Sequence, residues 1–159
     1  MASFDEVLLR SLVCLRMDDR EGQHVVTTLI EAAVQQGLLS QAFKEEAITA
    51  VLKREQSAST ALPDGIALPH GRTDCVTDIL CLIGIHPGGV EFGAPDHRPS
   101  HVFVLLLVPA TGGCNHVHFL ANLSRRLIKQ SVRDELLVAA TREQLLQVLL
   151  RHSDEGQLS

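Results

Sequence analysis

The segment that most constrains the fold is Val102-Phe103-Val104-Leu105-Leu106-Leu107-Val108, the longest uninterrupted apolar run of the chain. It is followed by Pro109 and is far too short to span a bilayer. An apolar run of this length without alternation is typical of a β-strand that is buried on both faces. We therefore expect a strand inside a sheet, with helices covering the sheet.

Two shorter apolar runs, residues 66–68 and 79–85, predict further buried strands, because both are bounded by Gly, Pro or Asp. The turn-rich segment 87–100 separates the last two predicted strands and is expected to contain a hairpin.

Helices are expected before and after these strands, where apolar residues recur at helical spacing. The expected elements are a strand with a short helical end over residues 7–17, a helix from about residue 21 to Gly37, a helix from a cap at Ser40 to about Arg54, and helices over residues 116–129, 132–140 and 142–151. This order of helices, strands and helices indicates an α/β fold in which helices flank a central mixed β-sheet.

Composition limits the class of protein. The 159 residues suit one domain, residues 1–159, with about residues 153–159 as a frayed tail. The net charge is −5 and the 14 Lys and Arg are scattered, which disfavours nucleic acid as a partner. No leader or membrane-length apolar segment is present, so we expect a cytoplasmic protein without membrane insertion. The four cysteines match no zinc motif and are expected to be free thiols.

One short segment carries the strongest chemical signal: Gly65-Ile66-Ala67-Leu68-Pro69-His70-Gly71. Pro69 cannot donate a ladder hydrogen bond, so we expect the strand to end there and to present His70 at its edge. Near pH 7 an imidazole with a pKa of about 6.5 is mostly neutral and has a free lone pair, which suits a nucleophile. Gly71 lets another backbone or a phosphate come close. By itself the segment fits a turn histidine without a chemical role equally well.

A longer segment that ends at His70 resembles a known signature. Residues 54–70 have the sequence Arg-Glu-Gln-Ser-Ala-Ser-Thr-Ala-Leu-Pro-Asp-Gly-Ile-Ala-Leu-Pro-His. This resembles, without a gap, the phosphorylation-site signature of enzyme IIA domains of the bacterial phosphotransferase system, in the mannitol, fructose and nitrogen-regulatory class. Blocks at residues 91–96, 102–109 and 116–124 resemble the same family in order and spacing. One departure is Ala61-Leu62-Pro63, which stands where the family usually has Gly-Ile-Gly.

The resemblance implies that His70 is the phosphorylated residue and that His116 is a second active-site histidine, which orients the phosphorylated imidazole. Helical spacing places His116 in line with the apolar stripe and pointing inward, whereas His118 faces solvent. The start of that helix also favours an anion, because its backbone N–H groups are unpaired. A buried histidine without a chemical role is the alternative for His116.

Three further kinds of residue complete the predicted site. The planar guanidinium of Arg54 matches phosphate oxygens, although a solvated cation that complements the end of a helix is the alternative. Ser59 and Thr60 are candidates to donate hydrogen bonds to the phosphoryl group, and ordinary loop capping fits them equally well. Gly71 is expected to leave room beside that group.

The implied function is that of a phosphoryl carrier, which accepts phosphate on His70 from a histidine-phosphocarrier protein and needs no metal or cofactor. A nitrogen-regulatory protein of this class acts on regulated cytoplasmic proteins, whereas a sugar-specific protein of the fructose or mannitol type passes phosphate to a IIB domain. The block Phe92-Gly93-Ala94-Pro95-Asp96 and the absence of a second enzyme II domain favour the regulatory role. The sugar-specific role is the alternative.

A metal-dependent hydrolase is a more remote alternative, because Cys114, His116 and His118 lie close together in sequence. However, the chain contains neither His-Glu-x-x-His nor Cys-x-x-Cys, the spacings that bind zinc. The opposite helix faces expected for His116 and His118 also make them poor joint ligands.

Overall fold

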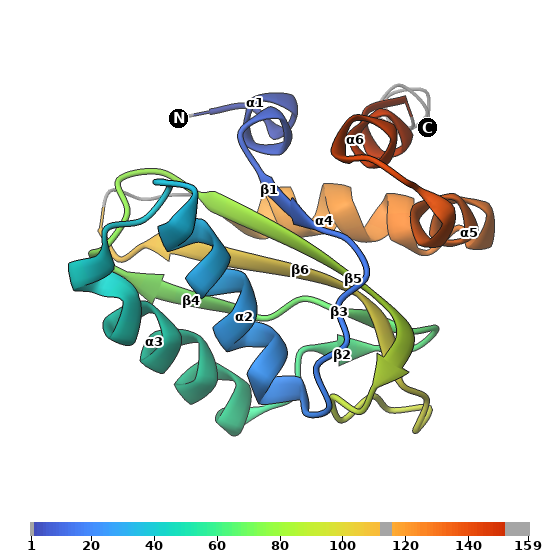
Figure 1. Cartoon of the computed structure of the whole chain (residues 1–159), viewed down its shortest axis with the longest axis horizontal. Coiled ribbons are helices and arrows are strands. Elements are labelled where there is room, and N and C mark those ends of the chain that lie inside the picture. The colour runs from blue at the N-terminus through green and yellow to red at the C-terminus, as the bar shows by residue number, and fades with distance from the viewer. Residues whose placement is uncertain (1, 112–115, 152–159) are drawn as a thin grey trace.

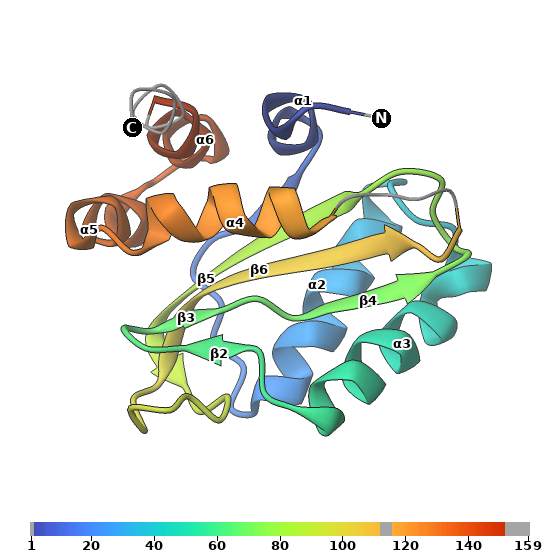
Figure 2. The same cartoon turned by 180° about the vertical axis from the view of Figure 1, so that it is seen from behind.

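The computed structural model describes residues 2–111 and 116–151. A six-stranded mixed sheet lies between two layers of helices (Figures 1 and 2), which confirms the predicted fold class. The strands are β1 (Leu12–Cys14), β2 (Ala61–Leu62), β3 (Ile66–Ala67), β4 (His70–Thr73), β5 (Leu80–Val90) and β6 (Ser100–Pro109). The helices are α1 (Phe4–Leu9), α2 (Gly22–Gln35), the 3₁₀ helix η1 (Gln41–Phe43), α3 (Lys44–Ser57), α4 (His116–Leu127), α5 (Gln130–Val138) and α6 (Arg142–Arg151). Cys114 and the predicted frayed tail lie outside the described residues.

Burial of β6 on both faces confirms the expectation from its apolar sequence. Alternate side chains enter the two helical layers, because successive residues of a strand point to opposite faces. Val102, Val104, Leu106 and Val108 pack in one cluster with α1, α4, α5 and α6, whereas Phe103, Leu105 and Leu107 pack in another with α2 and α3. None of these side chains is more than 2% exposed.

β6 also sets the order of the sheet. It pairs antiparallel with β5 and parallel with both β3 and β4. β1 extends the sheet beyond β5, and β2 pairs with β3. Val90 pairs with Ser100, so the hairpin expected in residues 87–100 is present. Among the described residues β4 pairs only with β6, which leaves β4 at an edge of the sheet.

β3 ends before Pro69, as expected, but His70 then begins a further strand, β4, which was not predicted. β3 pairs Ile66 with Val102 and β4 pairs His70 with Leu106, so the register along β6 is the same on both sides of Pro69. Pro69 interrupts the ladder because it has no N–H, but its carbonyl still accepts a hydrogen bond from the Leu106 N–H at 3.0 Å. The backbone therefore resumes as β4 with His70 at its first position.

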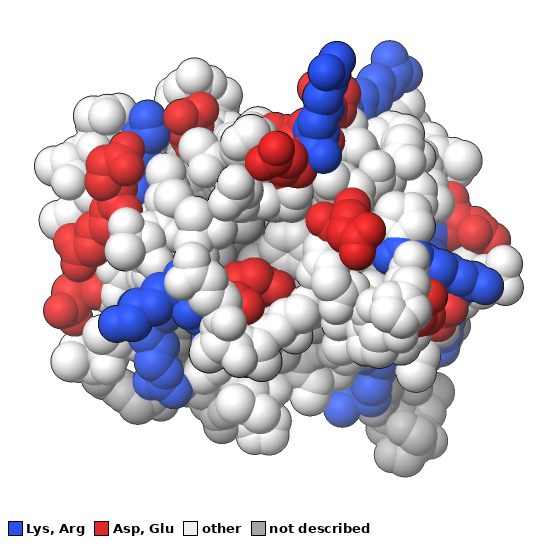
Figure 3. Space-filling model, turned by 90° about the horizontal axis from the view of Figure 1, so that it is seen from below, with Lys and Arg blue, Asp and Glu red and all other residues white. Residues whose placement is uncertain are grey.

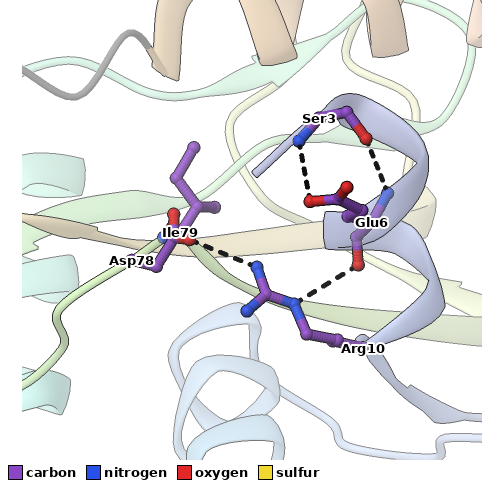
Figure 4. A network of polar contacts seen from close by, with 5 residues as sticks. All are labelled: Ser3, Glu6, Arg10, Asp78 and Ile79. Carbon is purple, nitrogen blue, oxygen red and sulfur yellow. Dashed lines mark hydrogen bonds and ion pairs between the residues drawn. The ribbon is translucent and has the colours of Figure 1, made fainter. Parts of the chain in front are cut away.

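The N-terminal segment also differs from the expectation, since residues 7–17 contain the end of a helix and then a short strand. α1 begins with a capping box, in which Ser3 and Glu6 each accept a hydrogen bond from the other's backbone N–H (Figure 4). Arg10, after the helix, donates to the Asp78 carboxylate at 3.4 Å. Burial opposes ionisation of Asp78, but hydrogen bonds from the Ile79 N–H and from Arg10 outweigh it and lower the pKa of Asp78.

In the departure Ala61-Leu62-Pro63 from the family signature, Ala61 and Leu62 form β2, which pairs with β3 as a hairpin, and Pro63 begins the turn. The turn places Asp64 and Gly65 at φ values of 70° and 82°, a region that these residue types tolerate. The Asp64 N–H donates to the Asp96 carboxylate at 2.9 Å, which ties this turn to the loop between β5 and β6.

On the face shown in Figure 3, acidic and basic side chains are both present on a largely uncharged surface. No helix within residues 2–111 and 116–151 is long and apolar enough to cross a membrane.

Candidate active site

A cleft of about 870 Å³ lies where the two helical layers meet at the β4 edge of the sheet. Figure 2 shows the arrangement, with α3 on one side of β4 and α4 on the other. The lining residues come from α3, β4 and the start of α4, and are Glu45, Glu46, Thr49, Ala50, Lys53, Arg54, Ser57, His70, Gly71, Arg72 and His116. Segments far apart in sequence therefore bring two histidines and an arginine, all predicted from sequence, to one cleft.

His70 is half-buried in this cleft and has a defined tautomer. Its ladder partner Leu106 belongs to the cluster packed against α4, so the His70 side chain leaves the sheet on the α4 side. Nδ1 of His70 lies 2.8 Å from the Leu68 carbonyl oxygen. A carbonyl can only accept a hydrogen bond, so Nδ1 carries a proton, and in the neutral form of the ring the lone pair is on Nε2.

The ring of His116 lies beside that of His70, with centroids 5.9 Å apart and ring planes inclined by 43°. His116 is the first residue of α4 and is half-buried, whereas His118 is exposed, as helical spacing predicts. The two histidines of the cleft therefore face each other across the junction between the sheet edge and α4.

Arg54 lies in the last turn of α3 and is exposed along the cleft. Its guanidinium donates to the Ala58 carbonyl at 3.0 Å, at the end of the helix. Within residues 2–111 and 116–151 this is the guanidinium's one hydrogen bond, so further donor positions can bind an anion. The position of Arg54 is therefore compatible with both roles considered from sequence. Its guanidinium can complement the C-terminal end of α3 and can also bind an anion in the cleft.

Gly71 brings α3 close to β4. A Cβ atom on Gly71 would lie 2.9 Å from the Ala50 carbonyl carbon and 2.9 Å from the Val51 nitrogen, both in the backbone of α3. Of the two possibilities considered from sequence, a neighbouring backbone therefore fills the space beside Gly71. The residue lines the cleft and lets α3 pack directly on the strand that carries His70.

Comparison with known proteins identifies the family of this chain. The family model described as "Phosphoenolpyruvate-dependent sugar phosphotransferase system, EIIA 2" matches residues 13–152. The chain belongs to this family. It is a component of the phosphotransferase system, as the resemblance of residues 54–70 implies.

Enzyme IIA relatives of both predicted branches are similar to this chain. The fructose-specific EIIA component of Haloferax volcanii is 32% identical over 138 residues, which is 87% of this chain and 88% of that protein. The nitrogen regulatory protein of Klebsiella oxytoca is 34% identical over 121 residues, which is 74% of this chain and 71% of that protein. The crystal structure of the nitrogen regulatory protein IIA-Ntr from Neisseria meningitidis has a TM-score of 0.77 and 25% identity, and covers 89% of this chain and 94% of that one.

Ser59 and Thr60 do not line the cleft of this enzyme IIA protein. The Ser59 hydroxyl donates to the Phe92 carbonyl at 2.8 Å, and the Thr60 hydroxyl donates to the Glu55 carboxylate at 2.5 Å. Each hydroxyl has one proton, so neither can donate to a second acceptor in this conformation. Their phosphoryl-binding role stays a prediction, and a hydrogen bond to phosphate from either hydroxyl would require that hydroxyl to change its partner.

Sequence reasoning did not select several charged residues of the cleft, among them Lys53, Arg72, Glu45 and Glu46. A usable signal existed for Arg72, since residues two apart in a strand share a face and Arg72 follows His70 at that spacing. The helical spacing of Ala50, Lys53, Arg54 and Ser57 would likewise have indicated one cleft-facing stripe. The resulting lining has both signs of charge.

Within the described residues, no three His, Cys, Asp or Glu side chains lie close enough together to hold a metal ion. Cys114, part of the metal-hydrolase alternative, lies outside them. Cys14, Cys75 and Cys81 are free thiols, as expected.

We predict that Gly71→Ala destabilises the fold by roughly 1–3 kcal/mol, because the new methyl group meets rigid backbone of α3 and forces it away from β4. Gly88→Ala is the matched control, since a Cβ there would meet only His86, at 3.9 Å. Urea unfolding of the wild type and the two variants measures the difference in the free energy of unfolding. Equal midpoints for the two variants would show that α3 adjusts without cost.

Proposed function

We propose that this chain carries a phosphoryl group on Nε2 of His70, as one domain spanning residues 1–159. The observation that supports this most is the hydrogen bond from Nδ1 of His70 to the Leu68 carbonyl, because it leaves the lone pair on the other ring nitrogen. An imidazole whose neutral form is held in one tautomer, in a cleft that an arginine and a second histidine also line, suits nucleophilic attack on phosphorus.

In the proposed transfer, the Nε2 lone pair forms a bond to phosphorus while the bond from phosphorus to a donor histidine breaks. The donor imidazole leaves with the electron pair of that bond. The proton on Nδ1 of His70 stays in place, since the Leu68 carbonyl accepts from it before and after transfer. The cation of Arg54 and the His116 ring stabilise the phosphoryl oxygens from the side of the cleft.

The donor in this proposal is a histidine-phosphocarrier protein of the cytoplasm. Two acceptors fit the comparisons, since relatives include a fructose-specific EIIA component and nitrogen regulatory proteins. A IIB domain would take the phosphate in a sugar-specific protein, and regulated proteins would read the added charge in a regulatory one. The block at residues 92–96 favours the regulatory role. A chase experiment, in which the labelled protein is mixed with the host's IIB proteins and the loss of label is measured, distinguishes the regulatory from the sugar-specific role.

We expect His70→Ala to abolish acid-labile labelling by a phosphorylated histidine-phosphocarrier protein, because it removes the imidazole whose Nδ1 is held by the Leu68 carbonyl in the cleft. His118→Ala serves as the control, since His118 is exposed on α4 and does not line the cleft. Labelling is measured by transfer of radioactive phosphate and mass spectrometry. Phosphate found on another residue would refute the assignment.

We expect Arg54→Ala and His116→Ala to slow phosphate acceptance by roughly ten- to a hundredfold without loss of the fold, because each removes one hydrogen bond to a charged phosphoryl group. Rapid-quench transfer kinetics measure the rate, and circular dichroism checks the fold. A variant that accepts phosphate at the normal rate would remove its residue from the site.

A further inference from the structure

Glu55, which neither lines the cleft nor entered the predicted site, holds the loop that follows α3. One oxygen of its carboxylate accepts from the Thr60 N–H at 2.8 Å, and the other accepts from the Thr60 hydroxyl at 2.5 Å. Glu55 is half-buried and Thr60 is only 8% exposed, so water competes weakly for these bonds. This two-point contact fixes both the backbone and the side chain of Thr60.

The hydrogen bonds continue from Thr60 to the histidine. The Thr60 carbonyl accepts from the Leu68 N–H at 3.2 Å. The Leu68 carbonyl in turn accepts from Nδ1 of His70 at 2.8 Å. Glu55, Thr60, Leu68 and His70 thus form one relay, in which each hydrogen bond restrains the residue whose next backbone group makes the following bond.

This relay acts where the ladder of backbone hydrogen bonds between strands is interrupted. Leu68 and Pro69 lie between β3 and β4, and Pro69 has no N–H for the ladder. The direction of the Leu68 carbonyl therefore depends on the bond from its own N–H to Thr60, together with the bond that Pro69 accepts from Leu106. Loss of the Glu55 contact removes support from one of these two.

We propose that Glu55 is a positioning residue for phosphate acceptance, which sets the tautomer of His70 through Thr60 and Leu68. The inference rests on the proposed function of His70 as the phosphate acceptor. In water both tautomers of a neutral imidazole are accessible. Only the form with the proton on Nδ1 has its lone pair on Nε2, so a population of the other form reduces the reactive fraction.

A purely structural role would also reduce activity, so the test needs a direct view of the ring. ¹⁵N NMR of the unphosphorylated protein reports which nitrogen of His70 carries the proton, and it requires no phosphate donor. Phosphate acceptance is measured in parallel by rapid quench, and stability by urea unfolding. The variants are Glu55→Ala, Thr60→Val and Thr60→Ser, with Gln56→Ala as the matched exposed control on the same helix turn.

We expect the wild type and Gln56→Ala to hold His70 with the proton on Nδ1. Glu55→Ala should populate both tautomers and accept phosphate about tenfold more slowly, the effect of one lost hydrogen bond. Thr60→Val should show a smaller shift because its N–H still donates to Glu55, and Thr60→Ser should behave like the wild type.

An unchanged His70 tautomer in Glu55→Ala would overturn the inference, whether or not its rate or stability falls. A changed tautomer with an unchanged acceptance rate would also overturn it. A wild type that accepts no phosphate on His70 would refute the proposed function instead, while the tautomer shift in Glu55→Ala would still show that the relay exists.

Discussion

Burial of β6 on both faces is the constraint on which the rest of this structure depends. Its seven apolar residues, 102–108, cannot be exposed on either side without large cost, so helices must cover both faces. α2 and α3 supply one cover, and α1, α4, α5 and α6 supply the other. Both helical layers end at the edge of the sheet. The cleft lies beside β4, where the two layers end.

This arrangement of sheet and helices places the residues of the cleft, because each wall of the cleft belongs to a different element. β4 takes its register from β6 and carries His70, α3 is drawn close by Gly71 and carries Arg54, and α4 begins at His116. A change of packing in either layer would therefore move one wall relative to the others. Rigid elements on three sides hold the side chains at fixed separations, as a transfer site requires.

The partner of His70 is a backbone carbonyl, and this suits a carrier. A carboxylate at Nδ1 would stabilise a charged imidazolium and raise the basicity of the ring. The Leu68 carbonyl directs the lone pair to Nε2 without adding a formal charge. A carrier has to release its phosphoryl group as well as accept it, so orientation without strong activation fits the proposed role.

The sequence alone determined the fold class, the order of most elements and the central residues of the cleft. Apolar runs and helical periodicity are local signals, and the resemblance of residues 54–70 to the family signature selected His70 and Arg54. The inward direction of His116 followed from helical geometry, which is also local. Only the tertiary structure decided that His70 begins β4, that Gly71 makes room for α3, and that Glu55 and Thr60 bond to each other. Those facts depend on which strand Pro69 interrupts, how closely two elements approach and which acceptor a hydroxyl contacts. Such contacts depend on how the chain packs in three dimensions, so they produce no periodic pattern in the sequence.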